Sequence, residues 1–125
     1  MKKTINTADA PAPIGPYSQA ILANGNLYLS GQIALDPDTG ELITNNIVDE
    51  THQVMKNIQA IINAAGLNMG QIIKCSIFIT NMDDFAEINE VYGTYFNNNT
   101  PARETVEVSR LPKNVNVEIS VIANG

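Results

Sequence analysis

Residues 49–79 read DETHQVMKNIQAIINAAGLNMGQIIKCSIFI, and the spacing of their apolar side chains changes partway along. Up to position 65 the apolar residues recur every three or four positions, which is the period of an amphipathic helix. Two acidic residues at the start suit the positive end of a helix dipole, and Gly66 suits a left-handed stop. The β-branched residues that follow are typical of a strand. The segment therefore predicts a helix over 49–65 and a strand over 71–79.

Further strands and a second helix are predicted on both sides of this segment. Asn24-Gly25 tolerates the positive φ angles of a tight hairpin turn, so the flanking apolar runs are expected to pair. The predicted elements, in order, are strands over 17–23 and 27–33, the helix over 49–65, the strand over 71–79, a helix over 83–96, and strands over 103–108 and 115–122, with a short extra strand near Thr4–Ile5. The second helix is expected to bury Phe85, Ile88, Tyr92 and Phe96.

This order of elements predicts an α+β fold in which two helices pack on one face of a mixed sheet. The helices can cover only that face, so water or a partner chain must cover the other. The 125 residues, 44% of them hydrophobic, suit a single domain over 1–125 with its own core.

Composition narrows the class of function. Seven basic against thirteen acidic residues give a net charge of −6, which argues against a nucleic-acid binder. Residues 4–12 are small and polar, unlike a signal peptide, and no stretch approaches the roughly 20 apolar residues of a membrane span. One cysteine, Cys75, excludes an internal disulfide. We expect a cytoplasmic protein that does not enter membranes.

Several kinds of catalytic site have no signature in the sequence. His52 is the only histidine and is expected to be exposed early in the first helix, so histidine-based catalysis is disfavoured. Cys75 fits a buried core position of the strand over 71–79 better than a nucleophile. Neither a metal-ligand pattern nor a glycine-rich nucleotide loop is present, so we expect no metal and no cofactor.

Two charged residues at strand positions are the strongest candidates for chemistry. Arg103 follows Pro101 at a strand entrance and shares a strand face with Thr105 and Glu107. It either pairs with a nearby acid or grips an anionic ligand with its planar fork. Glu118 interrupts an alternating apolar strand. It is either solvated on the outer sheet face or partly buried, with a raised pKa, as a general base.

Several motifs together resemble the RidA/YjgF family, and the resemblance runs from about Thr4 to Ala123. The matching blocks, in family order, are Ile14-Gly15-Pro16-Tyr17-Ser18-Gln19-Ala20, Leu29-Ser30-Gly31-Gln32-Ile33, Asn57-Ile58 with Ala64-Ala65-Gly66, Pro101-Ala102-Arg103, and Val106-Glu107-Val108 through Leu111-Pro112.

The resemblance implies a chorismate-mutase-like α+β fold assembled as a homotrimer, with ligand clefts between subunits. It also implies hydrolysis of reactive enamines and imines, chiefly 2-aminoacrylate and 2-iminobutanoate, to 2-oxo acids and ammonia. These intermediates escape from pyridoxal-phosphate-dependent dehydratases, so the implied role is metabolite damage control. Such a reaction needs an anchor, a positioned water and a proton route, and no cofactor.

By the same resemblance, Arg103 anchors the substrate carboxylate and Glu118 positions or activates the attacking water. The implied substrate-binding residues are Tyr17, Ser30, Gly31, Asn89 and Thr105. Many relatives have cysteine at the position of Thr105. Threonine has no thiol, so thiol chemistry is lost there, but the backbone that the resemblance places toward the ligand is unchanged.

Two other functions remain open from the sequence. An arginine-lined cleft also suits a non-catalytic trimer that senses small 2-oxo or imino acids. Some relatives are described as ribonucleases or translation inhibitors. The net charge of −6 and the single histidine make that third hypothesis the weakest.

Overall fold

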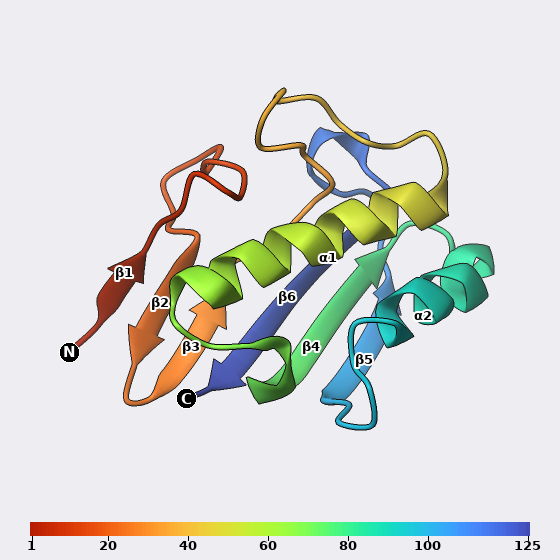
Figure 1. Ribbon diagram of the computed structural model, residues 1–125. Coiled ribbons are helices and arrows are strands. Elements are labelled where there is room, and N and C mark those ends of the chain that lie inside the picture. The colour runs from red at the N-terminus through yellow and green to blue at the C-terminus, as the bar shows by residue number, and fades with distance from the viewer.

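Residues 49–79, in which the spacing of apolar residues changes, form most of the long helix and a central strand of the sheet. The computed structural model describes residues 1–125, and its helices and strands follow the predicted order (Figure 1). The elements are β1 (Lys3–Ile5), β2 (Ala20–Ala23), β3 (Asn26–Leu29), α1 (Ile47–Ala64), β4 (Ile72–Ile79), α2 (Phe85–Gly93), β5 (Ala102–Glu107) and β6 (Val117–Asn124), with short 3-10 turns at Met69–Gln71, Met82–Asp84 and Pro112–Asn114.

The boundaries of α1 follow from its end residues. Asn46 caps the helix by accepting a hydrogen bond of 2.8 Å from the Asp49 backbone N–H, so the helix begins two residues before the predicted start. Gly66, with φ of 79°, follows the last turn as expected. Neither helix is both long and apolar enough to cross a lipid bilayer.

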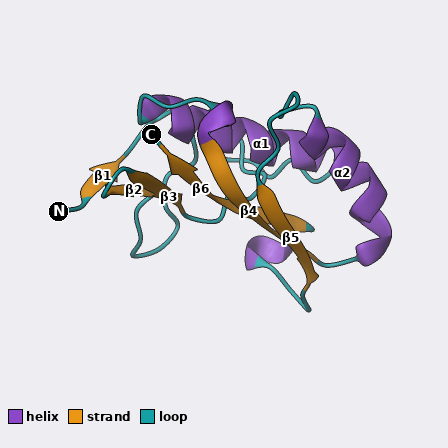
Figure 2. Ribbon diagram, turned by 90° about the horizontal axis from the view of Figure 1, so that it is seen from below, coloured by secondary structure: helices purple, strands orange, loops and turns teal.

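The six strands form one mixed sheet in the order β1-β2-β3-β6-β4-β5. β4 and β5 are parallel and the other pairs antiparallel. Asn24 and Gly25 have φ of 52° and 81° and form the predicted hairpin turn between β2 and β3. Both helices pack on one face of the sheet, which confirms the predicted layers (Figure 2).

Strands β2 and β3 are shorter than predicted. Residues 17–19 are not part of β2, and residues 30–33 are not part of β3. The Ser30 hydroxyl donates to the Ser18 carbonyl, and Gln32 forms an isolated bridge with Ile119 of β6. Tyr17, Ser30 and Gly31 therefore lie in loops that remain hydrogen-bonded to their neighbours rather than in strands.

The helix-facing side of the sheet carries the core. Cys75 is fully buried there, as predicted, together with Ile77 and Ile79. A bulge between Ile72 and Lys74 shifts the alternation, so Ile73 is exposed although the simple pattern pairs it with Cys75.

The second helix is shorter than predicted, so that Phe96 lies beyond its end, and it buries Val91 in addition to predicted residues. It ends at Gly93, and Ile88, Tyr92 and Phe96 are buried as expected. The prediction that Phe85 is buried is wrong, because Phe85 begins the helix beside Arg103 and keeps 36% of its surface exposed.

A buried carboxylate joins α1 to the start of β6, which the sequence pattern did not reveal. Glu50 is completely buried and accepts hydrogen bonds of 2.7 Å from the backbone N–H and the side-chain amide of Asn116, and one of 3.2 Å from Val117 N–H. These three donors satisfy the two carboxylate oxygens of Glu50, whose burial without hydrogen bonds would cost free energy of folding.

Glu50→Gln is expected to lower the free energy of unfolding by about 1–3 kcal/mol, because an amide replaces one acceptor oxygen with a donor. Urea denaturation measures the loss, and Glu87→Gln, a change at an exposed α2 residue, serves as the control. Equal denaturation midpoints for Glu50→Gln and wild type would contradict the structural role of Glu50.

Candidate functional site

Glu118 lies directly against Gly31 on the sheet face that the helices leave uncovered. A Cβ atom at position 31 would stand 2.8 Å from Glu118 Cδ and 2.9 Å from Oε2, closer than side-chain contacts allow. Reciprocal backbone hydrogen bonds of 2.8 and 3.1 Å between Gln32 and Ile119 fix the two segments in this position. Gly31 is therefore needed for its lack of a side chain.

The half-buried carboxyl of Glu118 is in a state suited to proton transfer. Burial raises the pKa of Glu118 above its usual value, because desolvation disfavours the charged form. The sequence hypothesis of a solvated glutamate on the outer face is thus wrong in its burial, although the face is the correct one. A carboxylate in this state accepts a proton at higher pH than an exposed one.

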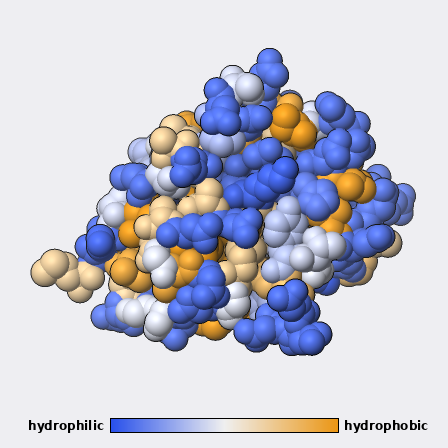
Figure 3. All heavy atoms as spheres, viewed as in Figure 1, coloured by the Kyte–Doolittle hydropathy of each residue, from blue (hydrophilic) through white to orange (hydrophobic).

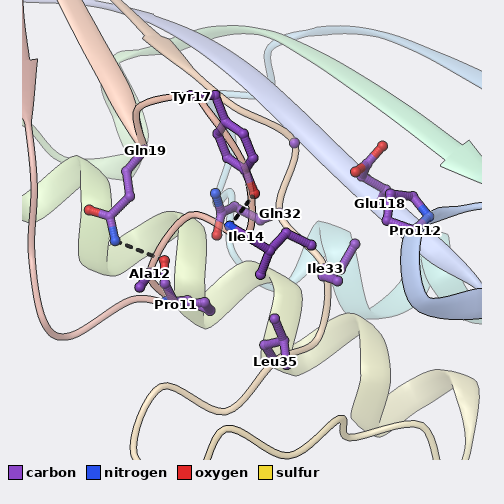
Figure 4. A pocket seen from close by; sticks show the side chains of 11 residues that line it. Pro11, Ala12, Ile14, Tyr17, Gln19, Gln32, Ile33, Leu35, Pro112 and Glu118 are labelled. Carbon is purple, nitrogen blue, oxygen red and sulfur yellow. Dashed lines mark hydrogen bonds between the residues drawn. The ribbon is translucent and has the colours of Figure 1, made fainter.

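A small pocket of about 40 Å³ joins Glu118 to Gly31 and to the loop around Tyr17. Figure 4 shows the residues that line it and the hydrogen bond that the Tyr17 hydroxyl accepts from the Ile14 N–H. That bond, 3.2 Å long, holds the exposed Tyr17 ring at the pocket wall. The apolar lining comes from Pro11, Ala12, Ile14, Ile33 and Leu35.

Gln19 organises this wall, a role that was not predicted from the sequence. It is only 3% exposed, and its side-chain amide donates to the carbonyls of Thr7 and Pro11 and accepts from the Thr7 N–H. The Gln19 carbonyl also accepts a 2.9 Å hydrogen bond from the Ser30 N–H. A glutamine in a predicted strand is expected at the surface, so the neighbouring sequence does not indicate that Gln19 is buried and organises the pocket wall.

Arg103 occupies a second polar centre, between β5 and α2. Its Nη1 donates to Asn89 Oδ1 at 2.6 Å, and its guanidinium carbon lies 5.0 Å from the Tyr92 ring centre and 5.7 Å from that of Phe85. Such distances are typical of cation–π contacts. Three α2 side chains therefore hold the guanidinium of Arg103.

No acid pairs with Arg103, so the sequence alternative of a structural ion pair is wrong. The neighbouring carboxylate, Glu104, points to the opposite face, where it pairs with Lys74 at 2.9 Å and accepts from Ser76 at 2.6 Å. The groups that contact the Arg103 guanidinium are all neutral, so its positive charge is not balanced by an acid. An arginine in this state can bind an anionic ligand.

Two buried hydroxyls lie near the same centre without a hydrogen-bond partner, those of Thr105 and Tyr92. Tyr92 contacts the buried Cys75, and desolvation raises the pKa of both groups. An inert thiol is consistent with Cys75 as a core residue, as predicted. The third residue of this strand face, Glu107, accepts a hydrogen bond from the Met82 N–H.

The two centres lie on opposite faces of one sheet. Arg103 pairs in register with Cys75 of β4, whereas Glu118 pairs with Phe78. Positions 75 and 78 are three residues apart, so their side chains alternate to opposite faces. The predicted site residues thus divide into Arg103, Asn89 and Thr105 on one side, and Tyr17, Ser30, Gly31 and Glu118 on the other.

His52 belongs to neither centre. Its Nδ1 lies 2.9 Å from the Tyr95 hydroxyl, and the side chain is half-buried rather than exposed as expected. The ring of Tyr95, two residues beyond the end of α2, packs against the His52 ring with 5.7 Å between their centres. No group of three or more His, Cys, Asp or Glu side chains is arranged to hold a metal ion.

The chain is similar in sequence to a known protein family and to many individual proteins. Residues 7–124 match the family model described as Endoribonuclease L-PSP. The chain is 53% identical to a RutC family protein of Pyrococcus horikoshii over 98% of each chain. It is 42% identical to the 2-iminobutanoate/2-iminopropanoate deaminase of Mus musculus, over 98% of this chain and 91% of that protein.

A solved structure with the same fold is that of E. coli TdcF with bound serine. It superimposes with a TM-score of 0.94 at 44% identity, over 98% of each chain. The family model, the identities and the shared fold agree with the resemblance in the sequence motifs. The chain therefore belongs to the RidA/YjgF family.

Proposed function

We propose that this protein hydrolyses the imine and enamine forms of small 2-amino acid derivatives, 2-iminobutanoate and 2-aminoacrylate, to 2-oxo acids and ammonia. The proposal rests on two side chains. Arg103 forms no ion pair with an acid, and the carboxyl of Glu118 is half-buried with a raised pKa. The substrate has one carboxylate to anchor and one electrophilic carbon to hydrate. These are the two tasks that the two centres suit.

In the proposed reaction Arg103 binds the substrate carboxylate through its fork. Glu118 accepts a proton from a water molecule as the water oxygen bonds to C2 of the iminium ion. Glu118 returns this proton to the nitrogen of the carbinolamine, the C–N bond breaks, and ammonia leaves as the C2 hydroxyl gives its proton to Glu118 and becomes the ketone. 2-Aminoacrylate first takes a solvent proton at C3, which converts the enamine to the corresponding iminium ion. Water supplies the oxygen, no electrons are exchanged, and no cofactor is required.

We further propose that the site forms between subunits of a homotrimer. Arg103 and Glu118 occupy opposite faces within one chain, so a second copy must bring the two together at one ligand. Tyr28 and Val106 are exposed on the sheet face without helices, whereas the surface over α1 and α2 is largely hydrophilic (Figure 3). Exposed apolar side chains on a sheet face without helices suit a contact between copies.

The remaining site residues take supporting roles in this proposal. Asn89 orients Arg103 through the 2.6 Å hydrogen bond. Ser30 and Tyr17 shape the Glu118 pocket, and Thr105 offers its backbone to the ligand. The mouse relative is named for this activity, and TdcF binds serine, a small amino acid with the same carboxylate. We place the reaction in the cytoplasm, where dehydratases produce these imines.

A coupled assay tests the proposal. A threonine dehydratase generates 2-iminobutanoate, and its decay is followed with and without the protein. The proposal predicts faster formation of 2-oxobutanoate and ammonia. An unchanged rate, with 2-oxobutanoate still bound, favours the alternative of a non-catalytic trimeric sensor of 2-oxo or imino acids. The family description as an endoribonuclease is not adopted, because a net charge of −6 opposes RNA binding.

Gly31→Ala is expected to lower kcat by roughly 10- to 100-fold, because the new methyl group displaces the Glu118 carboxyl from its position. The atoms it meets belong to a flexible side chain, so the fold is retained. Steady-state kinetics measure the loss, and the melting temperature checks the fold. Gly93→Ala, where a methyl group meets no atom, is the matched control. Wild-type kcat in Gly31→Ala would show that this contact does not matter.

A further inference from the structure

One face of α2 is devoted to Arg103. Phe85, Asn89 and Tyr92 are spaced four and three residues apart, so they line up on the same side of the helix. All three contact the guanidinium, Asn89 through a hydrogen bond and the two aromatic residues through their rings. The family resemblance assigned a role to Asn89 alone among them.

Phe85 differs from Tyr92 in what its ring does for the fold. Tyr92 is 5% exposed and belongs to the main core, whereas Phe85 is outside that core and partly open to solvent. Core packing therefore explains Tyr92 but leaves the phenyl ring of Phe85 without a structural purpose. Its ring centre nevertheless lies 5.7 Å from the Arg103 guanidinium carbon.

We propose that Phe85 is a positioning residue that holds the Arg103 fork ready for a planar carboxylate ligand. The proposal rests on the proposed function, because it assumes that Arg103 binds the substrate carboxylate. An arginine side chain loses considerable rotamer freedom when it grips a ligand. A ring that already restrains the guanidinium removes part of that loss before the ligand arrives.

Such a role depends on the π-electrons of residue 85 and not on its size. The carboxylate anchor acts equally before and during the chemical step, so loss of the ring raises KM and leaves kcat unchanged. The strength of a partly exposed cation–π contact corresponds to a change of roughly two- to fivefold. A merely structural role would lower the melting temperature or kcat instead.

The test compares Phe85→Leu, which keeps apolar bulk, with Phe85→Trp, which keeps an aromatic face. Met82→Leu is the matched control, because Met82 is a neighbouring exposed apolar residue, whereas the side chains that hold the Arg103 guanidinium are Phe85, Asn89 and Tyr92. The measurements are kcat and KM for 2-iminobutanoate, the Kd of 2-oxobutanoate by calorimetry, and the melting temperature.

The proposal predicts that KM and Kd rise roughly two- to fivefold in Phe85→Leu, while Phe85→Trp and Met82→Leu match wild type. Equal KM and Kd for the Leu and Trp variants would overturn it, as would tighter binding by Phe85→Leu. If wild type binds 2-oxobutanoate without hydrolysing the imine, the proposed function alone fails, and the Kd series still decides the role of Phe85. If wild type binds no 2-oxobutanoate, both proposals fail.

Discussion

Replacing Arg103 by alanine will lower kcat/KM for 2-iminobutanoate by about 10²–10³-fold, chiefly through KM. The guanidinium has no acid partner in the chain and is held by Asn89, Tyr92 and Phe85. Its removal takes away the positive group proposed to bind the substrate carboxylate. Steady-state kinetics in the dehydratase-coupled assay measure the change.

Two further variants separate the fork of Arg103 from its charge. Arg103→Lys keeps the charge but loses the bidentate geometry, so it is expected to recover only part of the activity. Arg110→Ala removes an exposed arginine whose Nε donates to Asn114, and it should behave as wild type. A kcat/KM of Arg103→Ala within threefold of wild type would refute the anchor.

Glu118→Gln will lower kcat by roughly 10²–10⁴-fold, because an amide cannot accept the proton of the attacking water. Binding of 2-oxobutanoate should be retained, since the Arg103 anchor is untouched. Glu41→Gln, at an exposed loop residue, is the matched control. Nearly full kcat in Glu118→Gln would remove the general base from the mechanism.

Because the pKa of Glu118 is raised, Glu118→Gln is expected to stabilise the folded chain although it lowers kcat. The folded chain holds the Glu118 proton more tightly than the unfolded chain, whose pKa is near 4.5. The ionised side chain therefore costs stability at neutral pH, and this cost disappears as pH falls below both pKa values. Glu118→Gln should melt at a higher temperature than wild type at pH 7, and the difference should vanish at low pH.

Activity should follow the same titration. Only the ionised form of Glu118 accepts a proton, so kcat of the wild type falls as pH decreases through the raised pKa. A pH–rate profile with its acidic limb above 4.5 agrees with the assignment. An acidic limb at or below that value would show that burial does not tune this group in the active protein.

Local patterns in the sequence were sufficient to predict much of the fold. The helical spacing before Gly66, the Asn24-Gly25 turn and the alternation of β6 each reflect short-range geometry. The ends of β2 and β3 were wrong because their limits depend on contacts between segments, such as the Ser30 hydroxyl with the Ser18 carbonyl. Residue-level propensity carries no record of such contacts.

Arg103 and Glu118 were candidates from their strand positions, and the binding roles of the other residues came from the family resemblance, but neither source revealed the surroundings of these side chains. The sequence left open whether Arg103 pairs with an acid, and only the sheet register shows that Glu104 faces away from it. Neither Glu50 nor Gln19 was predicted to be buried, yet each organises a buried network. A polar side chain buried by tertiary packing gives no local signal in one sequence.

The central claim is that one active site takes Arg103 from one subunit and Glu118 from another. Arg103→Ala and Glu118→Gln chains with different affinity tags are co-expressed, and oligomers carrying both tags are purified and assayed. A trimer that carries both kinds of chain has one interface at which the intact Arg103 of one chain meets the intact Glu118 of its neighbour, so about a third of the sites are restored. The account predicts recovery of kcat/KM to about that fraction of the wild-type value, although each variant alone keeps only a small part of it. Mixed oligomers as inactive as the separate variants would contradict the shared site.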